Sequence, residues 1–556
     1  MGKKVKVTFR NTITREFETD ITFKEIGEYF KENFEFPILA AKVDNDICDL
    51  TETLNKKCNI DFYDRSSSVG NSIYSRGLQF ILILAVNHLF GEDAHVVIEH
   101  SIDKGFYFEI NGIKQQKSIV ELLTNEMKKI VDEDLLFTKL SVARIDAIKF
   151  FKKKNWTDKV KVLKYISNTY VNLYRLDNVY DYFYGEMPYS TSSIDEFKLT
   201  SIRENGFVLS YPDIYVPSMT LDYKHHEKLF NAFLEYTNWG KMTGISNAAD
   251  LNEKVSTGGY NEIIQISELC YNGQLSRIAD VIKERENQIK LVLIAGPSSS
   301  GKTTTSKKLE YYLKSKGFNT ISISIDDYFF DRDKTPLDEN GEPDFESIKS
   351  IDVELFNKHL LKLINGESVN FPKYNFSTGK REMTRENVKL EKNDIIIIEG
   401  LHALNDVLTM SIDRKNKYKI YISPLTQLNV DDHNRIFTSD TRKLRRIVRD
   451  NKYRGYNADD TLKQWKKIRE GEEKYIFPFQ DDIDQIVNSA LTYEIGVLKV
   501  YAEPLLFSVD ENSLYYPEAI RLINFLRNFL PIPSEGVPKD SVLREFIGGS
   551  IFYDEK

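Results

Sequence analysis

Cysteine is scarce in this chain. Its 556 residues include three cysteines, Cys48, Cys58 and Cys270, which are far apart and show no C-x-x-C spacing. This set excludes a disulfide framework and is typical of a protein from a reducing compartment.

Long hydrophobic runs are also missing. The longest, LQFILILAV from Leu78, has about half of the length that a membrane span needs. It predicts a buried helix instead. The N-terminus, MGKKVKVTFR, contains no apolar signal core. We therefore expect a cytoplasmic protein with no membrane partner.

An excess of positive charge is absent as well. The net charge of −8 provides no general attraction to nucleic acid or to an anionic membrane, so any basic site must be local. Hydrophobic residues make up 41% and charged residues 29%, a balance typical of soluble globular proteins. The length predicts three or four units of ~100–200 residues each.

The residue pattern divides the chain into five segments. Residues 1–62 read as a small α+β unit, with the strand VKVTF, the helix FKEIGEYFKENF and the closing strand NIDFYD. Residues 63–215 form a longer α+β stretch rich in Phe and Tyr. Residues 216–285 form a Gly-containing linker followed by an amphipathic helical segment. Residues 286–510 form a third domain, and 511–556 a C-terminal helical extension.

The third domain has the pattern of a parallel sheet. LVLIA from Leu291, TISISI, DIIII and YKIYIS are continuous apolar runs, as expected of strands buried on both faces. Helical segments separate them, which favours an α/β fold with right-handed crossovers.

A phosphate-binding loop follows the first of these strands. GPSSSGKT matches G-x-x-x-x-G-K-T between a buried strand and a helix, the context that the motif requires. A chance glycine-rich turn of this pattern is expected in roughly one chain in fifty of this length. The glycines admit a phosphate close to the backbone, the lysine reaches the β- and γ-phosphates, and the threonine hydroxyl faces Mg²⁺. The motif predicts an ATP-dependent phosphotransferase, with ATP and Mg²⁺ held at Gly296, Ser298, Ser299, Ser300, Gly301, Lys302, Thr303 and Thr304.

Carboxylates follow two other strands of the expected sheet. Asp326 and Asp327 come after TISISI, and Glu399 comes after DIIII. A kinase needs a base beside the acceptor hydroxyl and a carboxylate near the metal, and both belong at the carboxyl ends of strands. Asp326, Asp327 and Glu399 are therefore candidates for these two roles, with Thr303 beside the metal. The alternatives are a turn or cap aspartate and a structural ion pair.

A basic helix is expected from Thr441, in TRKLRRIVRDNKYRG. Arg442, Arg445 or Arg446, and Arg449 recur every three or four residues and so share one face. In a kinase this pattern predicts a lid whose arginines neutralise charge on the transferring phosphate. A solvated charge run or a nucleic-acid patch is the alternative.

From Leu291 to Leu506 the chain resembles the uridine kinase and phosphoribulokinase family. The motifs are GPSSSGKTTTS, IDDYFFDR, DFESIKSIDVELFNKHL, PKYNFSTGKRE, IIIIEGLHALN, DTRKLRRIVRD and EEKYIFPFQDDID, in that order. The resemblance implies that Asp326 is the general base, with Lys302, Arg442 and Arg446 as its catalytic partners. It implies an acceptor site at Asp327, Tyr328, Phe329, Glu346, Tyr374, Arg381 and Arg449.

Two departures from the family pattern put pyrimidine selectivity in doubt. Gly379 stands where uridine kinases carry a base-reading histidine, and Glu346 replaces a ribose-binding aspartate. The arrangement as a whole, with LREFIGGSIF near the C-terminus, resembles bacterial kinases described as nucleoside or uridine kinases.

The first part of the chain resembles two modules of threonyl-tRNA synthetase. Residues 1–62 are similar to a TGS domain, which is ubiquitin-like, and 63–215 to the editing domain that follows it. That domain works through H-x-x-x-H and C-x-x-x-H. The matching positions here are Tyr74, Leu78, Phe183 and Met187, so we expect a degenerate, non-catalytic module.

Several functions remain open at this point. The leading hypothesis is phosphorylation of a small-molecule hydroxyl, with the 5′-hydroxyl of a ribonucleoside as acceptor. A kinase of another small alcohol, such as a sugar phosphate, is the second. An ATP-dependent regulator that contacts RNA through the TGS-like module is the third, and a GTPase is the weakest. Whether the chain forms a homo-oligomer also stays open.

Overall fold

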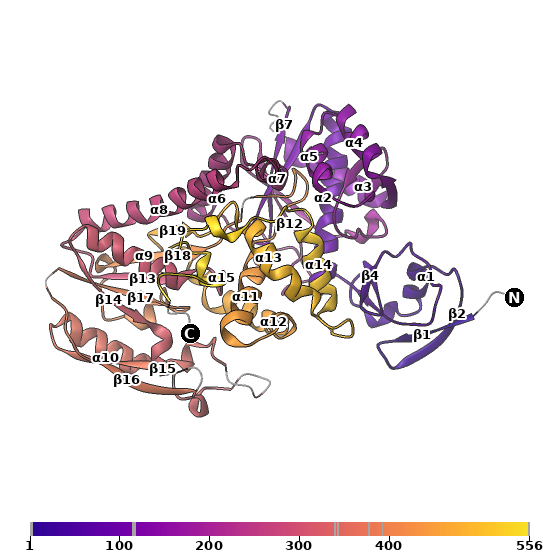
Figure 1. The fold of residues 1–556 in the computed structure, drawn as a ribbon. Helices are drawn as coiled ribbons and strands as arrows, with labels where there is room; N and C mark the ends of the chain where they lie inside the picture. Colours follow the sequence, from indigo (N-terminus) through magenta and orange to yellow (C-terminus); the bar gives the residue numbers. More distant parts are fainter. Residues whose placement is uncertain are drawn as a thin grey trace.

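A computed structural model describes residues 4–113, 118–337, 341, 344–375, 378–391, 393–426 and 428–553. Figure 1 shows the N-terminal module at one end of the molecule, the parallel sheet near the other, and the C-terminal residues between them.

The N-terminal module is a five-stranded sheet with one short helix. The strands are β1 (Lys4–Phe9), β2 (Ile13–Glu18), β3 (Ala40–Val43), β4 (Asp46–Cys48) and β5 (Cys58–Tyr63), in the order β2-β1-β5-β3-β4. Helix α1 (Phe23–Glu28) begins with a capping box between Thr22 and Glu25. The helix is shorter than the sequence predicts, because a 3₁₀ turn at Lys31–Asn33 replaces its second half.

The second region is built around one buried helix, α2 (Ser68–Phe90). Its other elements are β6 (His95–Ile102), β7 (Gly105–Asn111), α3 (Ile119–Asp132), β8 (Thr138–Ala143), α4 (Arg144–Lys153), α5 (Thr157–Tyr165), β9 (Tyr170–Leu176), β10 (Val179–Tyr182), β11 (Lys198–Arg203) and β12 (Gly206–Ser210). Helix α2 is long and apolar enough to span a membrane, yet 72% of its most apolar window is buried inside the protein. The run from Leu78 is therefore a core helix, as predicted.

The four positions that match the editing motifs lie in the apolar core of this region. Tyr74, Leu78 and Met187 are fully buried, and Phe183 packs on Phe80 with ring centroids 5.3 Å apart. The Tyr74 hydroxyl donates to the Glu196 carbonyl at 2.8 Å. The structure therefore places apolar packing and one hydrogen-bonded tyrosine hydroxyl at the four positions.

Three helices occupy the segment expected to be a linker. They are α6 (Glu227–Thr243), α7 (Ala248–Ser256) and α8 (Tyr260–Glu284). Gly244 ends α6 in the left-handed conformation, with φ of 69°. Gly244 therefore marks a helix end; the expected helix before the third domain is α8, and α6 and α7 lie in the part expected to be a linker.

The third domain has the predicted parallel sheet. Its strands are β13 (Leu291–Ala295), β14 (Asn319–Ser324), β17 (Asp394–Glu399), β18 (Lys417–Ser423) and β19 (Gln485–Asn488), in the order β14-β17-β13-β18-β19, and every neighbouring pair is parallel. Strand β13 lies at the centre, so the loop that follows it opens at the middle of the carboxyl edge.

The remaining elements surround this edge of the sheet. They are α9 (Lys302–Ser315), α10 (Val353–Ile364), the hairpin β15 (Val369–Asn375) and β16 (Lys380–Val388), α11 (Thr438–Arg454), α12 (Ala458–Tyr475), α13 (Glu494–Phe507), α14 (Tyr516–Leu526) and α15 (Arg544–Ile547). In Figure 1 the last residues run beside α11 and end near the sheet.

A buried ionic cluster joins the N-terminal half to the third domain. The Lys159 ammonium lies 2.8 Å from a carboxylate oxygen of Asp181 and 2.8 Å from one of Asp431, and all three side chains are fully buried. His433 contacts the second oxygen of Asp181 at 2.5 Å. Because Asp431 and His433 belong to the third domain, this cluster fixes how the two halves meet.

Lys159→Met should destabilise the protein by about 3–5 kcal/mol, because it leaves two buried carboxylates without their cation. Thermal unfolding of the full chain measures the effect. Lys152→Ala, at an exposed position of α4, is the control and should unfold like the wild type. A Lys159→Met variant as stable as that control would contradict a structural role for the cluster.

Candidate functional site

The phosphate loop is held in shape by its two glycines. A Cβ on Gly296 would lie 2.0 Å from the Ile422 carbonyl oxygen on the neighbouring strand β18, so no other residue fits there. Gly301 has φ of +87°, a conformation that favours glycine, and starts helix α9. The loop therefore turns directly from the centre of the sheet into a helix N-terminus.

Polar atoms of the loop are buried without hydrogen-bond partners among the described residues. These atoms are the hydroxyls of Ser299, which is 3% exposed, and of Ser300, which is fully buried. The Lys302 ammonium donates to the carbonyls of Gly296 and Pro297 at 3.0 and 3.1 Å. Burial lowers the pKa of Lys302. Unpartnered hydroxyls beside a half-buried ammonium are groups that an anionic phosphate would satisfy.

Two carboxylates face this lysine from the ends of neighbouring strands. Burial raises the pKa of Asp326, and the Lys302 charge opposes that rise. Burial, with the Asp326 charge, raises the pKa of Glu399 to about 7. The Ser324 hydroxyl donates to Glu399 at 3.0 Å. The expected acid–base and metal-side carboxylates are thus close enough to repel each other.

Asp327 differs from its neighbour in its partners. Its carboxylate accepts from the Tyr374 backbone N–H at 3.3 Å and lies 3.4 Å from the Lys373 ammonium. Asp327 therefore ties the turn after β14 to strand β15, whereas Asp326 faces the phosphate loop.

Helix α11 clamps the phosphate loop from outside. Arg442 donates to the Ser298 carbonyl at 3.0 Å, and Arg446 donates to the Ser298 hydroxyl at 2.6 Å. Glu472 of α12 accepts from the Ser298 N–H at 3.0 Å and forms an ion pair with Arg442. Both arginines are brought to the loop as expected.

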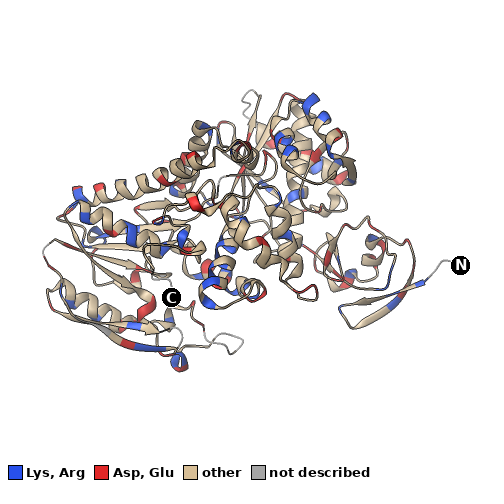
Figure 2. Ribbon diagram, viewed as in Figure 1, with Lys and Arg blue, Asp and Glu red and all other residues tan. Residues whose placement is uncertain are grey.

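Four of the seven basic side chains of this helix are buried, so its basic face is turned largely inward. Arg445 is fully buried, pairs with Glu494 at 2.7 Å and donates to the Ser489 carbonyl at 2.7 Å. Arg449 pairs with Asp450 at 2.8 Å. Figure 2 shows Lys and Arg gathered on α11 and α12 in the middle of the molecule.

The residues expected to stack on a nucleoside divide into two groups. Tyr328 is 1% exposed, packs on Phe356 at 4.9 Å between ring centroids and bonds His359 of α10 at 3.0 Å. It is a core residue with no open stacking face. Phe329 and Tyr374 pack edge to face at 5.6 Å beside Phe345, and both are largely buried.

Glu346 lies on the other side of the site, beside the helix that clamps the loop. A Cβ on Gly471 of α12 would be 3.0 Å from the Glu346 Cβ. Burial and the neighbouring Glu472 raise the pKa of Glu346 to about 7, while Arg446 opposes the rise. This carboxylate can gain or lose its proton near neutral pH.

Two other acceptor-side positions have structural partners. Arg381 pairs with Asp352, the N-cap of α10, at 3.0 Å, which ties β16 to that helix. Gly379 has φ of +69°, and a Cβ there would lie 2.9 Å from Arg332. A larger residue at Gly379 would therefore displace Arg332. Residues 376–377 of the motif PKYNFSTGKRE lie outside the described residues.

Asp326 and Glu399 repel each other, and a divalent cation beside them would reduce this repulsion. Within the described part of the chain, no group of three or more His, Cys, Asp or Glu side chains is arranged to hold a metal alone. Mg²⁺ is usually held by one or two protein oxygens together with phosphates and water. Burial and the Asp326 charge raise the pKa of Glu399, and a bound cation would lower it again.

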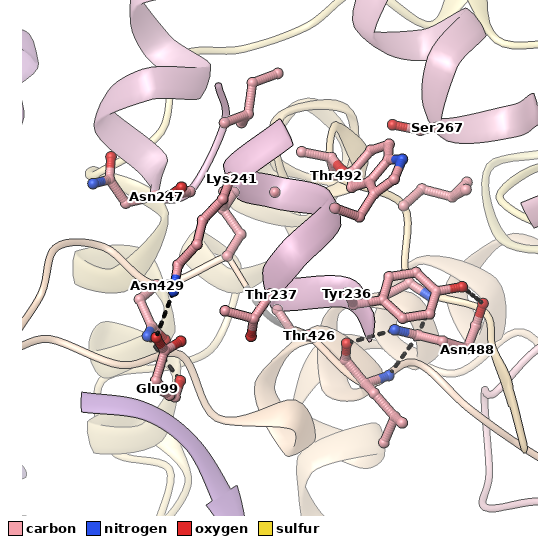
Figure 3. Close-up of a pocket in the computed structure, with 18 of the residues that line it drawn as sticks. Glu99, Tyr236, Thr237, Lys241, Asn247, Ser267, Thr426, Asn429, Asn488 and Thr492 are labelled. Atoms are coloured by element: carbon pink, nitrogen blue, oxygen red, sulfur yellow. Dashed lines mark hydrogen bonds and ion pairs between the residues drawn. The ribbon is translucent and has the colours of Figure 1, made fainter. Parts of the chain in front are cut away.

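A cavity of about 250 Å³ lies between the two halves, away from the phosphate loop. Strands β6 and β7, helices α6 and α8 and the loops after β18 and β19 line it. Figure 3 shows Lys241 pointing toward Glu99, 4.0 Å away, and Tyr236 beside Asn488. The Tyr271 hydroxyl of its wall bonds Thr305 of α9 at 2.6 Å, so the cavity touches the helix that follows the loop.

Sequence reasoning missed three residues that contact the loop. Glu472 stands in EEKYIFPFQDDID, Glu545 in LREFIGGSIF, and Tyr553 close to the end of the chain. Glu545 accepts from the Thr304 hydroxyl at 2.7 Å, and Tyr553 lies 3.3 Å from the same hydroxyl. Both motifs were visible, but no sequence pattern says which distant segment will reach the loop.

Known proteins match both halves of the chain. The model of the phosphoribulokinase / uridine kinase family matches residues 291–495. The uridine kinase of Mycoplasma genitalium is 32% identical over 178 residues, which cover 32% of this chain and 74% of that kinase.

The N-terminal region matches a different protein. The threonine–tRNA ligase of Acetivibrio thermocellus is 28% identical over 201 residues, 36% of this chain. The chain spans 31% of the length of that ligase. Among solved structures, one described as "a Possible Uridine Kinase from Bacillus stearothermophilus" is 22% identical, covers 27% of this chain and 80% of its own, and has a TM-score of 0.22.

A strand–loop–helix phosphate site at the centre of a parallel sheet, with these relatives, defines a P-loop kinase. The chain belongs to the phosphoribulokinase/uridine kinase family. Its N-terminal region is similar to part of a threonine–tRNA ligase.

Glu399→Gln should make the ligand-free protein more stable above neutral pH. The folded-state pKa of about 7 exceeds the ordinary value of 4.5, so the folded state holds the proton in this window. Stability from this group is therefore present at low pH and lost as pH rises through about 7. Glutamine stays neutral and removes that loss.

Thermal unfolding of both proteins between about pH 5 and pH 8 checks this sign. The two should converge toward pH 5 and separate by a few degrees at pH 8. Glu354→Gln, on α10 outside the site, controls for the loss of one carboxylate. A wild type that is the more stable protein at pH 8 would contradict the buried-repulsion account.

Proposed function

We propose that this kinase transfers the γ-phosphoryl group of ATP to a small-molecule hydroxyl, with the 5′-hydroxyl of a ribonucleoside as its preferred acceptor. The observation that carries the proposal is the placement of Asp326, a half-buried carboxylate after β14, where it interacts electrostatically with Lys302 of the phosphate loop. Asp326 would accept the proton of the attacking hydroxyl.

The loop would supply the binding of ATP. Backbone N–H groups from Ser298 to Thr304 and the Lys302 ammonium would contact the phosphates, and Arg442 and Arg446 would neutralise charge beside them. The Thr303 hydroxyl and Glu399 would hold Mg²⁺, which when bound screens the charge of the β- and γ-phosphates. Lys302 must turn outward from the Gly296 and Pro297 carbonyls to reach a phosphate.

The acceptor side supports a nucleoside through Phe329, Tyr374 and Glu346. The aromatic rings can pack against a base, and the Glu346 carboxylate can accept from two ribose hydroxyls. Gly379 offers no side chain to read a base edge, so several bases should be accepted. Asp327, Arg381 and Arg449, which hold structural partners, would support this pocket from behind.

A kinase of another small alcohol, such as a sugar phosphate, is the second candidate. Arg332, which lies against Gly379, is the observation that favours it, because an arginine there can bind an anionic acceptor. An RNA-linked regulator is the third candidate, and the similarity of the N-terminal region to a threonine–tRNA ligase is the one observation that supports it. Its phosphate release from ATP would respond to added tRNA rather than to a small acceptor.

Asp326→Asn should lower kcat by ~10²–10⁴ with little change in ATP binding, because it keeps the shape and removes the base. Asp327→Asn is the matched control, since that carboxylate faces β15 instead of the loop. A steady-state assay of ADP formation compares them. The larger effect at Asp327 would move the base by one position, and near-normal turnover of Lys302→Ala would remove the phosphate-loop assignment.

The wild type should phosphorylate ribonucleosides of several bases and reject the 2′-deoxy forms by ~10⁴ or more in kcat/KM, because a site built to bond a hydroxyl leaves its polar groups unpaired without it. Glu346→Gln should reduce this preference. A panel of ribonucleosides, deoxyribonucleosides, sugar phosphates and tRNA, followed by product analysis, tests it. Strict use of uridine, or activity on none of the nucleosides, would contradict the acceptor proposal.

A further inference from the structure

The C-terminal segment Asp540–Tyr553 crosses the start of helix α9, where the phosphate loop ends. Glu545 accepts hydrogen bonds from the Thr304 backbone N–H at 3.2 Å and from the Thr304 hydroxyl at 2.7 Å. Val542 lies so close to Gly301 that a Cβ there would be 2.3 Å from its methyl group. The segment therefore contacts the loop with both an apolar and a charged side chain.

Three lysines of the surrounding helices fasten the segment in this place. Lys308 of α9 pairs with Asp540 at 2.9 Å, and Lys307 donates to the Phe552 carbonyl at 2.5 Å. Lys452 of α11 donates to the Ile547 carbonyl at 3.0 Å. Both ends and the middle of the segment are thus anchored independently of Glu545.

A buried stack adds a further anchor. Phe546 is fully buried, and the Arg445 guanidinium lies 5.0 Å from its ring centroid. Because Arg445 also donates to the Ser299 carbonyl at 3.4 Å, this stack connects the segment to the loop from a second side.

The donors that Glu545 uses are those that an anion at this helix start would need. The first-turn N–H groups of an α-helix have no partner within the helix, and they bind phosphates when a P-loop precedes them. A carboxylate carries the same sign of charge and the same kind of acceptor oxygen. The Thr304 N–H has one hydrogen, so it cannot serve Glu545 and a phosphate fully at once.

We propose that the C-terminal segment is a latch in which Glu545 takes the place of a nucleotide phosphate at Thr304, so that ATP must displace it to bind. The latch rests on the proposed use of ATP and makes nucleotide affinity depend on a segment outside the matched family region, residues 291–495. Release of Glu545 alone frees the Thr304 backbone N–H, while Phe546 can keep the segment attached.

Removal of this carboxylate should strengthen ATP binding. In the full chain with Mg²⁺, Glu545→Ala and Glu545→Gln should each bind ATP about ten- to a hundredfold more tightly than the wild type by calorimetry, since a hydrogen bond to a charged group no longer has to be broken. Glu535→Ala, on an exposed turn of the same C-terminal region, is the matched control and should bind like the wild type.

Hydrogen exchange gives a second readout that does not depend on substitution. Addition of ATP to the wild type should increase exchange at the amides of residues 544–553, because the latch opens. Protection of those amides, or weaker ATP binding by the Glu545 variants, would overturn the latch and make the segment a wall of the nucleotide site.

The two proposals fail in different ways. Unchanged ATP affinity in both Glu545 variants, with a wild type that binds ATP and turns over, would reject the latch and leave the kinase proposal standing. Absence of ATP binding in wild type and variants alike would reject both.

Discussion

The Lys302 ammonium is the only group within the phosphate loop that balances the carboxylates gathered around it. Asp326, Glu399 and Glu545 all act on its pKa, and burial amplifies each interaction. Burial is the main cause of the raised pKa values of Asp326 and Glu399, and the charge of a neighbouring carboxylate adds to it. A divalent cation would stabilise the ionised form of both groups.

Contacts from other parts of the chain hold the conformation of the phosphate loop. Arg442, Arg446 and Glu472 hold the loop at Ser298 from outside, so the strained turn does not depend on a bound phosphate. The C-terminal segment reaches the same loop from the opposite direction at Thr304. Helix α11 thus serves the loop as a support, with four of its seven basic side chains buried.

The N-terminal half has its own apolar core and a buried polar contact with the kinase domain. Tyr74, Leu78, Phe183 and Met187, which match the editing motifs in position, form part of its core. Its contact with the kinase is polar and buried at Lys159, Asp181 and Asp431, and such a contact favours one arrangement of the two halves over others. The cavity beside this contact touches both Glu99 of the N-terminal half and the loop after β19.

Local patterns in the sequence determined the parallel strands, the phosphate loop, the buried helix α2 and the carboxylates at the strand ends, because periodicity, glycine placement and strand-end chemistry act over a few residues. They did not separate Asp326 from Asp327, since only the position of β15 decides which of the two is bound by Tyr374. Burial of Tyr328 against α10, the inward face of α11 and the approach of Glu545 to Thr304 were decided by tertiary structure. Each depends on packing between segments far apart in the chain, and no local pattern records which distant residue will arrive.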